Sequence, residues 1–147
     1  MDYTTWIPGL HSMRNAVLDA VTDEDLAFSP GRDALTWAAL LGQAIATQRD
    51  YLRSFTRGVM VWSEPIPPAS LAMARRLFDA QDDELVAILT SSHFDPKAPI
   101  DRPDLTRTAN EQIEAYVQFM LMFLAQATVY LRAQGRPVPP SVAANIG

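Results

Sequence analysis

The chain has 147 residues, the usual length of one domain with one hydrophobic core, so we expect residues 1–147 to form a single domain. Hydrophobic residues make up 48% of the chain and charged residues 20%, a balance that excludes a disordered protein. A net charge of −5 with scattered basic residues excludes a nucleic-acid-binding surface, and the lack of cysteine excludes disulfides, thiolate metal sites and a cysteine nucleophile.

The first predicted helix lies near the N-terminus, where apolar residues recur at steps of three and four. This spacing places side chains on one face of a helix. Pro8 is compatible with the first turn, because the N–H that proline lacks would have no partner there. The acidic residues 23–25 and the Ser-Pro-Gly sequence at 29–31 predict a connector after this helix. The apolar residues of the helix are Trp6, Leu10, Met13, Val17 and Val21.

The second predicted helix starts at an N-cap, either Asp33 or Thr36, and extends to about Arg53. The segment from Thr56 to Pro68 contains one glycine and three prolines, which do not suit a helix interior. We therefore expect a long loop in this segment. The apolar residues with helical spacing are Ala34, Trp37, Ala38, Leu41, Ala44, Ile45, Leu52 and Phe55.

The third predicted helix has apolar residues at helical spacing between Leu71 and Leu89. Four acidic residues in its second half lack the alternating ligands and the glycine of a calcium-binding loop, so we interpret them as a solvated face. The segment from Ser91 to Leu105 contains three prolines and predicts a second long loop. The four acidic residues are Asp79, Asp82, Asp83 and Glu84.

The last predicted helix begins at Thr108 and Glu111, which have the spacing of a capping box. In this motif each side chain accepts a hydrogen bond from the other residue's backbone N–H. The helix continues to Gln134 and stops at Gly135, which is followed by three prolines. Four helices, two long connections and no strand pattern predict an all-α fold, a four-helix bundle with long crossover loops.

The last predicted helix is apolar almost all the way around between Tyr116 and Leu124. Such a helix is either enclosed by its own domain or covered on its second side by another molecule. We expect a homodimer to which apolar residues of the last and first helices contribute, because a small bundle offers too few partners. The enclosed helix is the alternative.

The sequence predicts a cytoplasmic protein without a membrane partner. The longest apolar run, Phe119 to Ala125, is too short to span a bilayer. No basic segment followed by an apolar one marks a signal peptide. Eleven arginines against the single Lys97 fit a GC-rich bacterial genome.

Two segments carry a resemblance to a known family. Residues 129–135, VYLRAQG, followed by Pro139, are similar to the close of the last helix in the DinB-like family. Residues 36–52, TWAALLGQAIATQRDYL, are similar to the family's second helix. In the family a histidine-rich stretch, HxxHHRGQ, precedes the ending, and its glutamine matches Gln126. The resemblance implies a DinB-like four-helix bundle over nearly the whole chain.

Characterised DinB-like proteins hold a divalent metal, typically zinc or nickel, on three histidines, and several act as thiol-dependent transferases or isomerases. The resemblance places two of these histidines at Phe119 and Phe123 and the third at Gln43. Phenylalanine has no lone pair to donate, and a single amide oxygen is a poor ligand for a transition metal. We therefore expect no cofactor and no metal ligand. These three ligand-binding positions should form a dry, packed centre in which Gln43 reaches a polar partner or solvent.

No residue is assigned a catalytic role from the sequence. Neither His11 nor His93 has a second histidine three or four residues away, so we expect both to be exposed and structural. The chain has no recognisable nucleophile elbow and no glycine-rich phosphate loop. Glu111 and Glu114 are explained by helix capping and by the helix dipole.

Together these features predict a DinB-like bundle of unknown molecular function that has lost its metal site. Such a protein would act as a non-catalytic binding or dimerising module. The alternative is a DinB-like enzyme, a divalent-metal-dependent thiol S-transferase or isomerase whose metal is held by other side chains. A third hypothesis is a carrier that binds an apolar small molecule.

Overall fold

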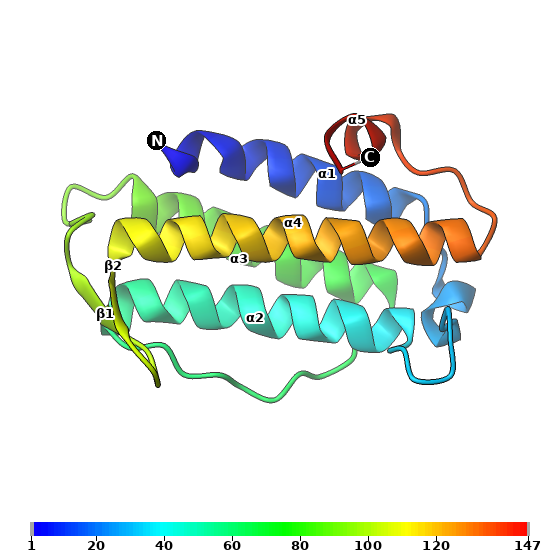
Figure 1. Cartoon of the computed structure of the whole chain (residues 1–147), viewed down its shortest axis with the longest axis horizontal. Helices are drawn as coiled ribbons and strands as arrows, with labels where there is room; N and C mark the ends of the chain where they lie inside the picture. The colour runs from blue at the N-terminus through cyan, green and yellow to red at the C-terminus, as the bar shows by residue number, and fades with distance from the viewer. Residues whose placement is uncertain (1, 147) are drawn as a thin grey trace.

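Four long helices packed lengthwise dominate the structure, a computed structural model that describes residues 2–146 (Figure 1). In chain order the elements, in which η marks a 3-10 helix, are η1 (Tyr3–Trp6), α1 (Ile7–Asp19), η2 (Asp23–Ala27), α2 (Trp37–Arg57), α3 (Leu71–Leu89), β1 (Pro99–Asp101), β2 (Thr106–Thr108), α4 (Ala109–Ala133) and α5 (Pro140–Ile146). The predicted all-α four-helix bundle is confirmed, and the connections after α2 and α3 are long, as expected.

Each long helix packs mainly against two others. Helix α1 contacts α3 and α4, and α2 contacts the same two helices. In Figure 1, α4 lies in front between α1 and α2, and α3 lies behind them. Large side chains from three helices, Trp37, Phe78 and Tyr116, are fully buried in the core. Within residues 2–146, no helix combines the length and the apolar character that spanning a membrane requires.

The ends of α2 follow from two local signals. The hydroxyl of Thr36 accepts a hydrogen bond from the N–H of Ala39 at 3.2 Å, so Thr36 rather than Asp33 is the N-cap. At the other end, Gly58 has a φ of 70°, a left-handed conformation that glycine adopts without strain. Helix α2 therefore continues to Arg57, one turn beyond its predicted end.

Helix α4 has the predicted ends. The Glu111 carboxylate accepts a hydrogen bond from the N–H of Thr108 at 2.7 Å, and the Thr108 hydroxyl accepts one from the N–H of Glu111 at 3.2 Å. This reciprocal pair is the predicted capping box. Gly135, with a φ of 67°, follows the last turn and ends the helix as expected.

A short β-hairpin and a fifth helix were not predicted. Strands β1 and β2 pair antiparallel within and beside the segment expected to be a loop. Each strand has three residues, too few to leave a readable alternation of apolar and polar side chains. Helix α5 begins at Pro140, because proline is well suited to the first turn of a helix. Its buried Val142 faces the bundle, and α5 packs on α1 and α4 (Figure 1).

The connection after α2 crosses back over that helix. We call residues 59–69 the strap. A Cβ atom on Gly42 would lie 2.7 Å from the carbonyl oxygen of Ile66, so only glycine allows the strap to come this close. The carboxylate of Asp50 accepts hydrogen bonds from the N–H and the hydroxyl of Ser63, at 2.8 and 2.7 Å. These contacts hold the strap along the outer side of α2.

Candidate functional site

The three positions indicated by the family resemblance lie together between α2 and α4. Gln43, Phe119 and Phe123 line one open hollow with a volume of about 120 Å³. Gln126, which matches the family's glutamine, lines the same hollow. Residues far apart in the sequence thus meet at one place on the surface. The remaining lining residues are Leu40, Ala44, Thr47 and Met122.

The three side chains lie at different depths. Phe123 is buried, as expected for a packed centre. Phe119 is half-buried and stacks on Tyr51, with ring centroids 6.0 Å apart and ring planes 25° apart. Gln43 is exposed at the edge of the hollow, one of the two outcomes expected for it. The expectation of a dry, packed centre at all three positions is therefore wrong: the hollow is packed at Phe123 but open to solvent at Gln43.

The side chains around the hollow do not fit zinc or nickel. Its polar groups are the amides of Gln43 and Gln126 and the hydroxyl of Thr47. None of its lining residues is a histidine, cysteine, aspartate or glutamate, the residues that hold these metals in proteins. Elsewhere in residues 2–146, no three histidine or acidic side chains come together as a metal site would require.

A second polar group of residues, which the sequence did not reveal, lies inside the bundle. We call it the polar network. Arg14 donates hydrogen bonds to both carboxylate oxygens of Asp82, at 3.0 and 2.6 Å, and Gln48 donates one to the same carboxylate at 2.7 Å. The Arg14 side chain is 0% exposed, and its guanidinium lies 4.2 Å from the centre of the Phe78 ring. The members are His11, Arg14, Gln48, Asp82 and Tyr116, so all four long helices contribute.

His11 connects Asp82 to Tyr116. Its Nδ1 lies 3.2 Å from Asp82 Oδ1, and its Nε2 lies 2.6 Å from the Tyr116 hydroxyl oxygen. Burial lowers the pKa of His11 to about 4. The nearby Asp82 carboxylate raises this pKa and the Arg14 guanidinium lowers it, but burial has the largest effect. Burial also raises the pKa of the Tyr116 hydroxyl, which stays protonated. At neutral pH the Tyr116 hydroxyl donates to Nε2, which leaves the ring proton on Nδ1, the nitrogen nearer to Asp82; this proton assignment follows from the partners.

The structure corrects two sequence-based interpretations here. His11 is buried rather than exposed, and Asp82 is ion-paired with Arg14 rather than part of a solvated face. The other acidic residues of α3, Asp79, Asp83 and Glu84, are exposed as expected. The Tyr116 end of the network lies in the core, since Tyr116 is only 1% exposed, whereas the Asp82 side chain is 17% exposed. His93 is exposed, also as expected.

We expect His11 to make the free energy of unfolding fall by about 2 kcal/mol between pH 7 and pH 5. The pKa is about 4 in the folded protein and 6.5 for an ordinary histidine, so the unfolded chain binds a proton first as the pH falls. This stabilisation is fully present above pH 6.5 and is lost progressively toward pH 4. Urea denaturation at both pH values measures the change.

The two histidines of the chain provide a matched pair of variants for this measurement. His11→Gln should abolish the loss of stability between pH 7 and pH 5. His93→Gln removes an exposed histidine and should leave the loss of stability between pH 7 and pH 5 unchanged. A pH dependence that survives in His11→Gln would show that the buried histidine is not its source.

Comparison with known proteins identifies the fold. No protein-family model matches the sequence, and no curated protein is similar to it in sequence. The structure is similar to that of YjoA, a DinB-like protein from Bacillus subtilis, with a TM-score of 0.74 and 13% sequence identity. The similarity covers 95% of this chain and 96% of the YjoA chain. This chain therefore has a DinB-like fold.

Proposed function

We propose that this chain is a DinB-like bundle that has lost its metal site and acts as a non-catalytic, homodimerising module. The observation that carries the proposal is the hollow at Gln43, Phe119 and Phe123, where side chains unable to hold zinc or nickel meet between α2 and α4. The same donor set speaks against the alternative, a metal-dependent thiol S-transferase or isomerase. A cytoplasmic location fits a chain without cysteine, which needs no oxidising compartment.

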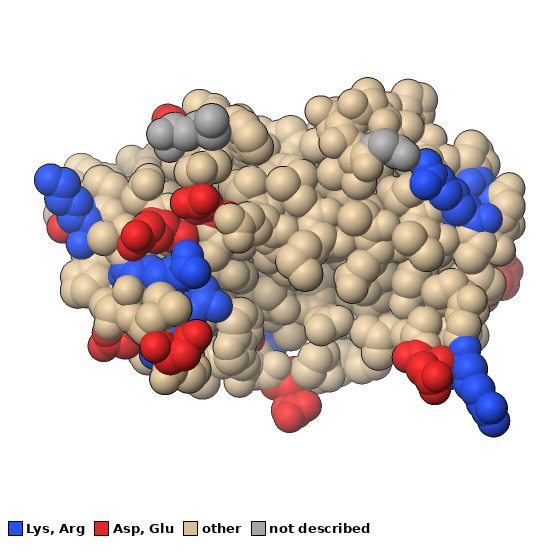
Figure 2. All heavy atoms as spheres, in the orientation of Figure 1, with Lys and Arg blue, Asp and Glu red and all other residues tan. Residues whose placement is uncertain are grey.

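The outer side of α4 supports the dimer. Helix α4 has no charged residue between Glu114 and Arg132, and Met122 near its middle is 66% exposed. Figure 2 shows charged side chains near the two ends of this side of the molecule and few over its middle. We call the outward residues of this stretch the α4 face. They are Gln118, Leu121, Met122, Ala125, Gln126 and Val129.

The spacing and the chemistry of the α4 face suit a symmetric interface. Gln118, Met122, Ala125 and Val129 follow one another at steps of four and three, so they form a stripe against which a second helix can pack. In a two-fold dimer each patch meets its own copy, so a charge near the axis would face a like charge. An uncharged stripe avoids this repulsion. The half-buried Leu121 adds apolar area beside it.

The dimer is tested by light scattering at high micromolar concentration. We expect the unmodified protein to have twice the mass of one chain. Met122→Glu would place two carboxylates opposite each other, so it should raise the dimer dissociation constant by at least about tenfold.

A matched control separates this effect from a general loss of solubility or folding. Val86 is 51% exposed on α3, away from the α4 face, so Val86→Glu adds the same charge elsewhere and should leave the dimer intact. A monomeric unmodified protein would refute the dimer. Equal effects of the two variants would refute the α4 face as its interface.

A further inference from the structure

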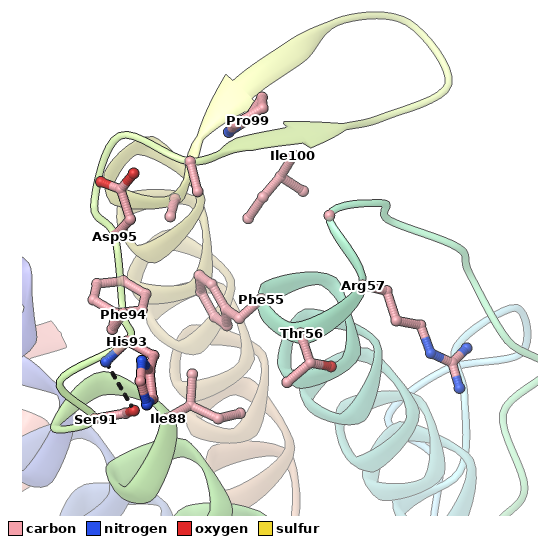
Figure 3. Close-up of a pocket in the computed structure, with 13 residues that line it drawn as sticks. Phe55, Thr56, Arg57, Ile88, Ser91, His93, Phe94, Asp95, Pro99 and Ile100 are labelled. Atoms are coloured by element: carbon pink, nitrogen blue, oxygen red, sulfur yellow. Dashed lines mark hydrogen bonds between the residues drawn. The ribbon is translucent and has the colours of Figure 1, made fainter.

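A larger cavity, with a volume of about 490 Å³, lies at the end of the bundle where α2 and α3 terminate (Figure 3). The last turn of α2, the end of α3, the loop before β1, and the start of α4 surround it. It shares no lining residue with the hollow between α2 and α4. Its volume falls in the range of about 300–1,000 Å³ that is usual for small-molecule sites.

Apolar side chains form the walls of the cavity. Phe55 and Phe94 meet edge to face, with ring centroids 6.2 Å apart and planes at 69°. Ile88 and Ile100 lie on either side of this aromatic pair (Figure 3). Aromatic rings favour edge-to-face or offset contacts with a further ring, so such a wall suits a flat ring compound better than a flexible chain.

The charged side chains at the rim of the cavity do not point into it. In Figure 3 the side chain of Arg57 extends away from Phe55 and Phe94, and the carboxylate of Asp95 also points away from the two rings. One oxygen of Asp95 already accepts a hydrogen bond from the N–H of Lys97 at 2.9 Å. A charged ligand would therefore lose water without gaining a counter-charge, which is costly.

One polar side chain at the cavity has hydrogen-bonding capacity to spare. His93 lines the cavity near Ile88, and its backbone N–H donates to the hydroxyl of Ser91 at 3.2 Å (Figure 3). Its ring nitrogens make no hydrogen bond with any other residue among 2–146. A neutral imidazole can donate from one nitrogen and accept at the other.

We propose that this cavity binds a small, neutral, ring-containing molecule of one or two fused rings with a single hydrogen-bonding group. The ring lies against Phe55 and Phe94, between Ile88 and Ile100, and its polar group faces His93. This site is separate from the α4 face and does not depend on dimerisation.

Three probes with the same ring and different charge test the proposal in amide NMR titrations. Indole is neutral, indole-3-acetate is an anion and tryptamine is a cation. We expect indole to bind and to shift the signals of Phe55, Phe94 and Ile100, and we expect both charged probes to bind at least about tenfold more weakly. Absence of indole binding, equal affinities for the three probes, or shifts centred on Gln43 and Phe119 would each overturn the proposal.

A pair of variants tests the location of the site independently. Ala98 lines the cavity, so Ala98→Leu should fill it and weaken indole binding at least about tenfold. Ala80→Leu makes the same change at an exposed position on α3 and should leave binding unchanged. If the folded Ala98→Leu protein bound indole as tightly as the unmodified protein does, the location of the site would be wrong. If that variant does not fold, the shifts in the unmodified protein still decide the question.

Discussion

Replacing Asp82 by alanine should lower the free energy of unfolding by about 3–5 kcal/mol, the usual cost of removing one partner from a buried ion pair. The Asp82 carboxylate accepts two hydrogen bonds from Arg14 and one from Gln48. Without it, the guanidinium of Arg14 would remain buried with no counter-charge. Asp82 is itself 17% exposed, so water entering beside Arg14 should place the loss toward the lower end of this range.

The adjacent residue provides the control. Asp83 is exposed on the same helix, so Asp83→Ala should change stability by no more than about 0.5 kcal/mol. Asp82→Asn keeps a hydrogen-bond acceptor but removes the charge. Its loss in free energy of unfolding should lie between those of Asp82→Ala and Asp83→Ala. Urea denaturation followed by circular dichroism measures all three. Similar losses for Asp82→Ala and Asp83→Ala would refute the importance of the polar network.

Phe123→Ala should also lower the free energy of unfolding by about 3–5 kcal/mol, because it leaves a cavity where a buried ring is packed between α2 and α4. Phe119→Ala should cost less, since the Phe119 ring is half-buried and water can replace part of it. The order of the two losses of stability tests how far each ring contributes to the core. Val86→Ala, at an exposed position on α3 away from the α4 face, is the control.

Thermal or urea denaturation of the three variants gives the comparison. Equal, small losses of stability for Phe123→Ala and Val86→Ala would mean that the Phe123 ring is not part of the packed core. A loss for Phe119→Ala as large as that for Phe123→Ala would contradict the difference in burial between the two rings.

The long helices could be predicted because their signals are local and repeated. Helix α4 begins at the Thr108 capping box and ends before Gly135, and both signals concern only backbone groups within one turn. The end of α2 was predicted one turn too early, although Phe55 continues the apolar spacing and Gly58 provides the stop signal after Arg57. The hairpin and α5 are too short for periodicity to reveal them.

The polar network was missed although the sequence contains a signal for it. Arg14 lies four residues after Leu10 and three before Val17, so it occupies a position on the apolar stripe of α1. Asp82 lies between Phe78 and Leu85 on α3 in the same way. A charged residue within such a stripe on each of two helices predicts a buried pair. Which residues pair depends on the arrangement of the helices, which the sequence does not show.

The hollow between α2 and α4 could be predicted only from the family resemblance. Nothing in the composition or the periodicity marks Gln43, Phe119 and Phe123 as neighbours, and only the resemblance to the DinB-like family aligned them. Their convergence on one hollow is a property of the structure. The cavity at Phe55 and Phe94 could not be predicted from the sequence. Its walls include the loop before β1 and the start of α4, which are distant from Phe55 in the sequence and meet it only in the folded chain.

The metal content of purified, tag-free protein is the most direct test of the proposed loss of the metal site. We predict zinc and nickel contents far below one ion per chain after dialysis, because the hollow offers two amides, one hydroxyl and aromatic rings in place of three histidines. Stoichiometric zinc or nickel that resists dialysis would contradict the proposal and would favour the metal-dependent enzyme instead.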